Sequence, residues 1–387
     1  MAPRRPHPAH RAAPRRPPPP FALGYRMPAE WEPHAATWLA WPHEPRDWPG
    51  KFEAVPWVMA EMARHLQGAE RIRVLVRDGR ERTRAARALA DSGVSLARVD
   101  FVVAATDRSW TRDFLPLGVV RSRGGRREPG AVKWRFNGWA RYRNHAADEA
   151  AGRRVARRLG VPLWHPEAVV RGRRLPVVLE GGAVDVDGEG TLLATEQCLF
   201  AGAQARGRAL GREGWEAVLR DYLGAETVVW LGEGIAGDDT GGHVDDFARF
   251  VAPGRVVVAQ ERNHRDPNYD ALREARLRLA AARDARGRHL EVVTLPMPRP
   301  VAFAAERLPA SYANFYIGTG AVLVPTFDDP ADRVALGILA DLFPDRTVVG
   351  VHARDFVLGL GTIHCSTQQE PLARRRTRAA APGRGRR

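Results

Sequence analysis

The chain of 387 residues has little cysteine, almost no lysine and no long apolar run. Its two cysteines, Cys198 and Cys365, lie 167 positions apart, which excludes the disulfide framework of a small secreted protein and suits a reducing cytoplasm. No apolar stretch approaches the roughly 18 residues that a membrane-spanning helix needs. The basic N-terminal segment is not followed by the apolar region of a secretory signal. We therefore expect a soluble, cytoplasmic, globular protein without a membrane partner.

Acidic residues are absent from both ends of the chain. Five arginines within residues 1–20 and seven within 371–387 account for 12 of the formal net charge of +15. The remainder is close to neutral, so we expect no specific nucleic-acid partner. The Pro/Arg-rich tails, 1–20 and 372–387, are predicted to be disordered and to flank one catalytic domain, 21–371. Two interpretations of the tails stay open: solvated extensions, or contact with polyanions, which would make the chain a polyanion-binding protein.

Between the tails, β-rich and amphipathic segments alternate, which predicts an α/β protein. Strand-like runs occupy 71–76, 99–104, 176–186, 227–231, 255–259, 321–327 and 347–352. Helix-like runs occupy 55–67, 80–91, 146–159, 213–223, 269–284 and 330–342. Polar residues follow strand-like runs at intervals of 51 to 71 residues: Asp113, Glu180, His243, Asn314 and Cys365. This spacing indicates about five modules that each bring one polar group to a common centre.

Cys365 is the candidate nucleophile, although a cysteine in such a segment can equally be a small buried hydrophobic residue. It follows His364 and a glycine-rich approach, GLGTIHC. Glycine lets the backbone turn and lets a ligand come close, so this thiol is predicted to be reachable.

The segment GDDTGGHVDDFARFV, 237–251, is dense in acids around one histidine. His243 and Asp245 are two positions apart, so on an extended strand they would point the same way. A histidine can transfer a proton near neutral pH, and a carboxylate can hold a cation or orient the ring. The alternative is a polar surface turn that leads into a buried strand.

Two further carboxylates lie at the ends of apolar stretches of sequence. Asp113 follows Trp110 in WTRDFLP, and Glu180 precedes two glycines in LEGGAVDV. A buried charge needs a partner, which could be a protein cation or a cationic substrate. For Asp113 the alternative is a salt bridge to Arg112, and for Glu180 a turn contact to Gly181 and Gly182. Trp110 favours a site, because its ring can stack on a planar cation.

One thiol, one histidine and three carboxylates exceed what an ordinary cysteine hydrolase needs. The surplus negative charge makes sense if the electrophile is itself a planar cation with several N–H donors. A guanidinium fits this description. We therefore expect a thiol that attacks a guanidinium carbon.

The chain also resembles the agmatine deiminase and bacterial peptidylarginine deiminase family, which has the pentein fold. The resemblance spans residues 27–371 and is carried by MPAEWEPHAATWLAWP, WTRD, RFNGW, LEGGAVDVDGEGTLLATEQCL, GHVDDFARFV, ASYANFYIGTGAVLVPTF and GTIHCSTQQEP. It implies an α/β propeller of five modules with a pseudo-five-fold arrangement around a central active site. By this resemblance Cys365 is the nucleophile, His243 the proton-transfer residue and Glu180 its partner, while Asp113 and Asp245 bind the guanidinium.

The resemblance implies hydrolysis of a guanidinium to a ureido group and ammonia through an amidino-cysteine (thiouronium) intermediate on Cys365, with no cofactor and no metal. Agmatine, giving N-carbamoylputrescine in polyamine biosynthesis, is the favoured substrate; peptidylarginine or another arginine derivative is the alternative. Asp238 or Asp239 could bind the distal ammonium of agmatine, and Asp239 is our candidate, although both could be turn acids. Relatives often associate, so a homo-oligomer is also implied.

Some loops depart from the family pattern. The segment after Cys198, the sequence GWARY at 138–142, GTG at 318–320 and GLG at 359–361 differ from the usual continuations. We expect these loops to shape the pocket, so the chemistry is predicted more firmly than the substrate.

Overall fold

The computed structural model describes residues 17–373 of the chain. The tails that we predicted to be disordered lie largely outside this range, and the domain limits 21–371 stay a prediction. None of the helices within residues 17–373 is long and apolar enough to cross a membrane.

Five sheets of three or four strands recur within the described residues, and each follows the same order. Two antiparallel strands are followed by a helix and then by a strand parallel to its neighbour. In chain order from the second sheet the elements are β4 (Leu117–Arg123), β5 (Arg126–Val132), α4 (Ala146–Arg158), β6 (Leu163–Trp164); β9 (Asp185–Val186), β10 (Thr191–Thr195), α5 (Gly211–Leu223), β11 (Thr227–Leu231); β12 (Ala248–Ala252), β13 (Arg255–Gln260), α6 (Asn268–Ala281), β14 (Glu291–Pro296); β17 (Tyr316–Ile317), β18 (Ala321–Thr326), α7 (Pro330–Leu342), β19 (Thr347–His352).

The first sheet joins the two ends of the described chain. It contains β1 (His34–Ala40), α1 (Val55–Leu66), β2 (Arg71–Val76), α2 (Gly79–Asp91) and β3 (Val99–Val103), and it takes its antiparallel strand β20 (Gln368–Pro371) from the C-terminal end. Trp38 pairs with Gln368 in this ladder. The segment just before β20, which contains Cys365, is thereby held against the start of the chain.

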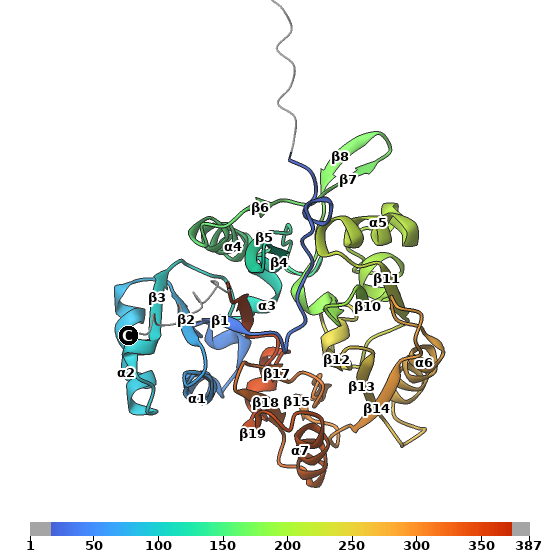
Figure 1. The fold of residues 1–387 in the computed structure, drawn as a ribbon. Coiled ribbons are helices and arrows are strands. Elements are labelled where there is room, and N and C mark those ends of the chain that lie inside the picture. The colour runs from blue at the N-terminus through green and yellow to red at the C-terminus, as the bar shows by residue number, and fades with distance from the viewer. Residues whose placement is uncertain (1–16, 374–387) are drawn as a thin grey trace, which may run out of the picture.

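The sheets are arranged around a centre, with the helices at the periphery (Figure 1). Two hairpins stand apart from the five sheets: β7 (Glu167–Val170) with β8 (Arg173–Pro176), which projects from the body, and β15 (Ala302–Phe303) with β16 (Glu306–Arg307). The predicted α/β class is confirmed. The recurrence of one order of elements agrees with the predicted modules, while the pseudo-five-fold propeller stays a prediction.

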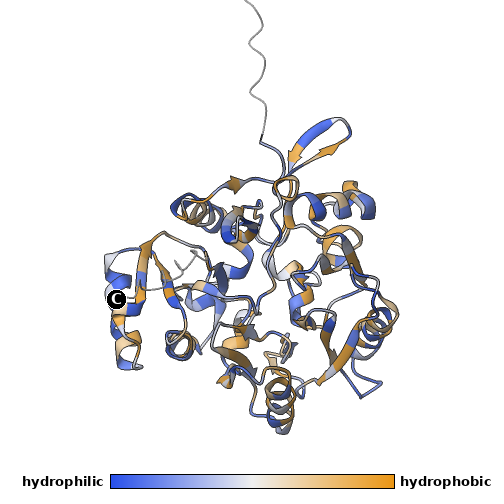
Figure 2. Ribbon diagram, viewed as in Figure 1, coloured by the Kyte–Doolittle hydropathy of each residue, from blue (hydrophilic) through white to orange (hydrophobic). Residues whose placement is uncertain are grey.

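The element boundaries follow from local chemistry. The side chain of Asp329 caps α7 and accepts from the backbone of Ala331, Asp332 completes a capping box, and Pro330 begins the helix. Strands such as β13 are rich in valine and almost wholly buried. In Figure 2 the strands are mainly orange, and the peripheral helices carry both colours because one face of each packs inward.

The strand-like run predicted over 176–186 is wrong in its middle. Here β8 ends at Pro176, a 3-10 turn occupies η5 (Gly181–Ala183), and only Asp185–Val186 pair as β9. A Cβ on Gly181 would lie 2.4 Å from the Arg112 carbonyl oxygen, so only glycine permits this approach. The interruption places Glu180 beside the centre of the molecule.

Candidate active site

The five side chains predicted to carry chemistry meet through a chain of contacts. His243 lies 3.6 Å from Glu180, 3.8 Å from Asp113 and 3.9 Å from Asp245, and the Asp245 carboxylate lies 3.9 Å from the Cys365 sulfur. All five are buried. Asp113 and Cys365 open into a cavity of about 720 Å³, which is large enough for a small guanidino compound.

The five residues lie on connections between strands. Asp113 belongs to the short helix α3 (Thr111–Phe114), and Glu180 directly precedes η5. His243 precedes a second 3-10 turn, η8 (Val244–Asp246). The predicted strand geometry of His243 and Asp245 is therefore wrong. Gly241 and Gly242, with φ of 84° and 98°, turn the chain, so the two side chains approach each other through a turn.

Cys365 faces the cavity with its thiol beside an amide. The Asn314 side-chain amide donates to Sγ at 3.1 Å. A Cβ on Gly361 would lie 3.0 Å from Trp110 and 3.1 Å from the Cys365 Cβ, so this glycine allows the loop to pack closely. Burial, with the carboxylates of Asp245, Asp246 and Asp113, raises the pKa of the Cys365 thiol well above its usual value. Before a substrate binds, the group is therefore a thiol.

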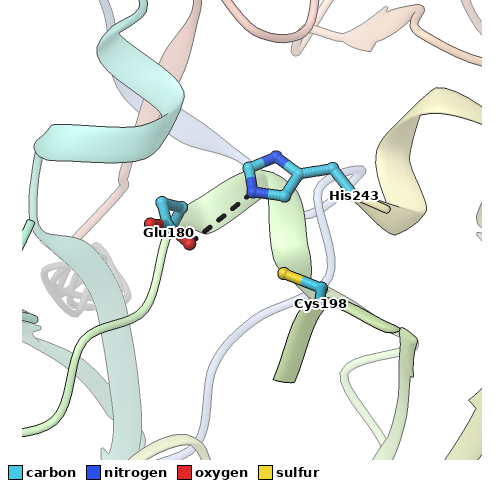
Figure 3. A group of neighbouring side chains, drawn as sticks. All are labelled: Glu180, Cys198 and His243. Carbon is cyan, nitrogen blue, oxygen red and sulfur yellow. Dashed lines mark ion pairs between the residues drawn. The ribbon is translucent and has the colours of Figure 1, made fainter. Parts of the chain in front are cut away.

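His243 is surrounded by acidic groups, and its Nε2 points at Glu180 (Figure 3). Burial alone would lower the pKa of His243, but the Asp113 carboxylate, the Cys198 thiol and Glu180 together raise it well above the usual value. The ring is therefore cationic before a substrate binds, which makes it able to donate a proton.

Asp113 and Asp245 flank a position where no Cβ fits. A Cβ on Gly182 would lie 2.5 Å from His243 Nδ1 and 3.0 Å from an oxygen of each aspartate. The Asp113 carboxylate accepts from Trp139 Nε1 at 2.8 Å and from the Gly182 backbone at 3.1 Å. Burial raises the pKa of Asp113 to about 6; His243 opposes this rise, and Asp245 and Glu180 add to it.

One oxygen of Asp245 is buried without a partner. Asp245 Oδ2 accepts from His364 Nδ1 at 2.5 Å, whereas Oδ1 finds no hydrogen-bond partner among the described residues. A buried acceptor without a donor costs free energy. The free oxygen is therefore a candidate acceptor for a ligand N–H group.

Glu180 makes an ion pair that the sequence did not indicate. Arg206 Nε donates to both Glu180 oxygens, at 2.9 and 3.0 Å, so the alternative of a turn contact to the neighbouring glycines does not describe this residue. Glu180, Cys198 and His243 also have ligand atoms within 4.8 Å of one another, as do Asp245, Asp246 and Cys365. The Arg206 guanidinium already neutralises Glu180, which disfavours a cation in the first group. That the protein needs no metal stays a prediction.

The other predicted contacts line the cavity more peripherally. Trp110 borders it and packs on Trp48. Asp239 borders it as well and accepts from the Tyr142 hydroxyl at 2.5 Å. Asp238 instead accepts from the backbone of Thr240 and Gly242, as a turn acid does. The alternative salt bridge of Asp113 to Arg112 is absent from the described residues, because Arg112 pairs with Glu30 at 3.1 Å.

Sequence reasoning missed several residues of this site. It assigned no role to Arg206, to Trp139, or to Glu30, which binds His364 Nε2 at 2.8 Å. It used Asn314 only as one of the five polar residues that follow strand-like runs at similar intervals. The one available signal was the departure of the loops 138–142, 359–361 and after Cys198 from the family pattern, because Trp139, Tyr142 and Leu360 from the first two line the cavity.

With this geometry in view, the chain was compared with known proteins. Residues 26–371 match the model of the Porphyromonas-type peptidyl-arginine deiminase family. The chain belongs to this family. It is 37% identical over 375 residues to the agmatine deiminase of Ectopseudomonas mendocina (strain ymp), covering 91% of this chain and 97% of the relative. To the agmatine deiminase of Stutzerimonas stutzeri (strain A1501) it is 38% identical over 371 residues, covering 90% and 96%.

The family is also supported by structure. The agmatine deiminase of Enterococcus faecalis, solved as an enzyme catalysing its reaction, superposes with a TM-score of 0.82 at 32% identity, covering 92% of this chain and 98% of that one. The predicted family, the pentein fold class and the predicted enzyme class are confirmed. As a member of a deiminase family the protein is a hydrolase of guanidino carbon–nitrogen bonds.

Proposed function

We propose that this protein is an agmatine deiminase, which hydrolyses agmatine to N-carbamoylputrescine and ammonia. The observation that carries this proposal is the buried Oδ1 of Asp245, which has no hydrogen-bond partner among the described residues. His243 Nδ1 lies 3.9 Å from this oxygen and 3.8 Å from Asp113, and the other Asp245 oxygen lies 3.9 Å from Cys365 Sγ. Two carboxylates around a nucleophile suit a substrate that is a planar cation with several N–H donors. The names of the relatives, agmatine deiminases at 37% and 38% identity, support the choice of substrate.

The reaction begins with binding of the guanidinium between Asp113 and Asp245. This orients its carbon toward Cys365 Sγ, and the new positive charge favours the thiolate, so the thiol releases its proton to solvent. The thiolate attacks the guanidinium carbon to give a tetrahedral adduct. Cationic His243 donates a proton to one nitrogen, the C–N bond breaks, and ammonia leaves. A thiouronium on Cys365 remains.

The second half of the reaction uses His243 as a base. The ring, now neutral, takes a proton from a water that attacks the same carbon. The C–S bond then breaks as the hydroxyl proton of the adduct passes to the departing sulfur, which releases the ureido product and regenerates the thiol. Glu180, held by Arg206 and 3.6 Å from His243, stabilises the imidazolium at the start and end of the cycle.

The distal ammonium of agmatine is proposed to bind near Asp239. Of the other acids that line the outer part of the cavity, Glu44 is paired with Arg46 at 2.8 Å and Asp47 with Arg108 at 2.7 Å, whereas Glu306 is exposed on β16. Asp239 makes no ion pair within residues 17–373, which leaves its charge for a ligand. Trp110 forms part of the cavity wall along which the aliphatic chain would lie.

The test is an assay of ammonia release and ureido product with agmatine, arginine, an N-acylarginine and arginyl peptides. We expect agmatine to have the highest kcat/KM, and Cys365→Ala to lose at least about a thousandfold in turnover. Cys198→Ala removes the only other thiol and also a contact of His243, so its turnover should fall, but far less than that of Cys365→Ala. A thiouronium trapped on Cys365 in His243→Ala would identify the intermediate.

Other outcomes would redirect the proposal. Preferred turnover of an arginyl peptide or N-acylarginine would make the protein a peptidylarginine or arginine-derivative deiminase. No turnover, together with polyanion binding that depends on the tails, would favour the polyanion-binding function. A cytoplasmic location and association into a homo-oligomer stay predictions.

A further inference from the structure

His364 lies between two carboxylates beneath the candidate active site. Its Nδ1 is 2.5 Å from Asp245 Oδ2, and its Nε2 is 2.8 Å from Glu30 Oε2. The side chain is 2% exposed, so water does not replace either contact. A neutral imidazole has one N–H donor, and an ionised carboxylate can only accept. If both carboxylates are ionised, the ring must donate from both nitrogens and is an imidazolium.

Glu30 is held in its ionised form by other groups. Its oxygens accept from Arg112 Nη2 at 3.1 Å, from Arg249 Nη2 at 2.9 Å and from the Ile317 backbone at 2.8 Å. Burial alone would raise the pKa of Glu30, but Arg249, His364 and Arg112 hold it well below the usual value.

Asp245 and its neighbour Asp246 differ in the direction in which their pKa is shifted. Both are buried, and burial alone would raise the pKa of either. The hydrogen bond from His364 lowers the pKa of Asp245 below its usual value, whereas the pKa of Asp246, which faces Asp245 and accepts from Asn314 at 3.0 Å, is raised well above it. The contact with His364 is the largest of the interactions that favour the charged form of Asp245, and His243 and Arg249 add to it.

We propose that His364 is a positioning residue: as an imidazolium fixed between Asp245 and Glu30, it keeps Asp245 ionised and directs the free Oδ1 toward the bound guanidinium. This rests on the proposed function. His364 occupies Oδ2, so the other oxygen is the one left for substrate. Without His364, Asp245 and Asp246 would behave as an acid pair that shares a proton, and guanidinium binding would weaken.

Titratable and charged groups surround His364 and Asp245. Those that face His364 or Asp245 are Glu30, Arg112, Arg249, Asp185, His243, Asp113, Asp246 and Cys365. Of these, Arg112 and Arg249 neutralise Glu30 rather than Asp245. His243 lies 3.9 Å from the free Oδ1, whereas His364 is hydrogen-bonded to Oδ2 at 2.5 Å and is therefore the nearest cation to Asp245.

The kinetic test compares wild type with His364→Gln, which offers one donor group and no charge. His352→Gln, at a histidine whose side chain is 52% exposed on β19, is the matched control. We expect His364→Gln to raise KM for the guanidino substrate about tenfold or more at neutral pH, with a smaller fall in kcat. We also expect the acid limb of kcat/KM, which Asp113 sets near pH 6 in wild type, to move upward by about one pH unit, because Asp245 then shares a proton with Asp246 and titrates above Asp113. Thermal unfolding of each variant reports on folding. A His364→Gln profile that superimposes on that of wild type would overturn the proposal.

A second measurement does not depend on turnover. In wild-type protein with ¹⁵N-labelled histidine, the His364 ring is assigned through its bonds to its own backbone. We expect two N–H-type nitrogen signals from this ring at pH 7, as an imidazolium gives. One protonated and one bare nitrogen at pH 7 would refute the proposal, even if the enzyme is active. If no guanidine is turned over but both nitrogens carry protons, the proposed function fails and the imidazolium stands.

Discussion

At the scale of single residues, the candidate site is governed by how each buried charge is compensated. Glu180 has a guanidinium partner in Arg206, and Asp245 has an imidazole partner in His364. Asp113 has only the neutral donors Trp139 and Gly182 in hydrogen-bond contact, and its pKa is raised to about 6. These acids are similarly buried, so the partner of each carboxylate decides whether it is ionised or can be protonated near neutral pH.

The first prediction concerns the pH dependence set by Asp113. Because its pKa is raised to about 6, Asp113 loses its charge as the pH falls through 6, and kcat/KM should fall about tenfold per pH unit below that point. Trp139→Phe removes a hydrogen-bond donor to the charged form of Asp113. The acid limb, which is the pH range in which kcat/KM falls, should therefore move upward by roughly half a pH unit or more. The measurement is kcat/KM against pH.

The control for this prediction is Trp57→Phe, at a tryptophan that is 52% exposed on α1. This control variant should leave the acid limb of kcat/KM at the same pH as in wild type. A limb near the usual pKa of an aspartic acid, about 4, would contradict the assignment to Asp113. So would an unchanged profile in Trp139→Phe.

The second prediction concerns the space at Gly182. In Gly182→Ala the new Cβ would lie 2.5 Å from His243 Nδ1, so the ring must move. We expect kcat/KM to fall about a hundredfold, because small displacements of catalytic groups are costly. Gly79→Ala, at a glycine with nothing within 4 Å of its Cβ position, should keep full activity. Equal activity of the two variants would show that the site tolerates the methyl group.

At the scale of elements, the regular strands and helices position the site, and the connections supply its side chains. Three non-glycine residues with positive φ line the cavity: Trp139, Ala304 and Leu360 have φ of 57°, 49° and 66°. Such conformations cost free energy and persist where surrounding contacts hold them. For Trp139 those contacts include the hydrogen bond to Asp113 and the edge-to-face packing with Phe136.

The third prediction contrasts two glycines of helices. Gly337 lies within α7, exposed, with nothing within 4 Å of its Cβ position, so Gly337→Ala should raise the free energy of unfolding by about 0.5–1 kcal/mol. Gly224 ends α5 with φ of 75°, and a Cβ there would lie 3.1 Å from Arg26. Gly224→Ala should therefore lower stability by about 1 kcal/mol or more. Urea unfolding measures both free energies. Changes of the same sign in the two variants would contradict the expected contrast between these glycines.

At the scale of the whole molecule, the five sheets place residues from distant parts of the chain at one centre. Glu30 and His364, which are 334 positions apart, are in contact because β20 pairs with β1. This closure makes the C-terminal thiol part of the same site as residues from the middle of the chain.

The fourth prediction concerns the charge of the whole molecule. Residues 1–16 and 374–387 hold 12 arginines and no acid, so a protein of residues 17–373 would carry a formal net charge of +3. All the site residues lie within 17–373. We expect this shorter protein to keep kcat/KM within about twofold of the full chain and to lose any salt-sensitive binding to polyanions. A large loss of turnover would assign a catalytic role to the tails.

Much of the fold was predictable because its signals are local. All six predicted helices are present, and α1, α2 and α7 match their predicted ranges to within one residue. The strand predicted over 176–186 was wrong because apolar residues at the site were read as strand, whereas Gly181 and Gly182 turn the chain there. Residue types alone indicated a thiol, a histidine and surplus carboxylates, and from these a guanidinium substrate.

The sequence by itself determined the α/β class, the positions of most elements and the types of residue available for chemistry, because burial periodicity and side-chain chemistry are properties of short segments. Only the tertiary structure decided which charges neighbour one another. Arg206 stands against Glu180 and His364 against Asp245, and the second pair is separated by 119 positions. Protonation in a buried site depends on these distances and on the exclusion of water, which no short segment contains.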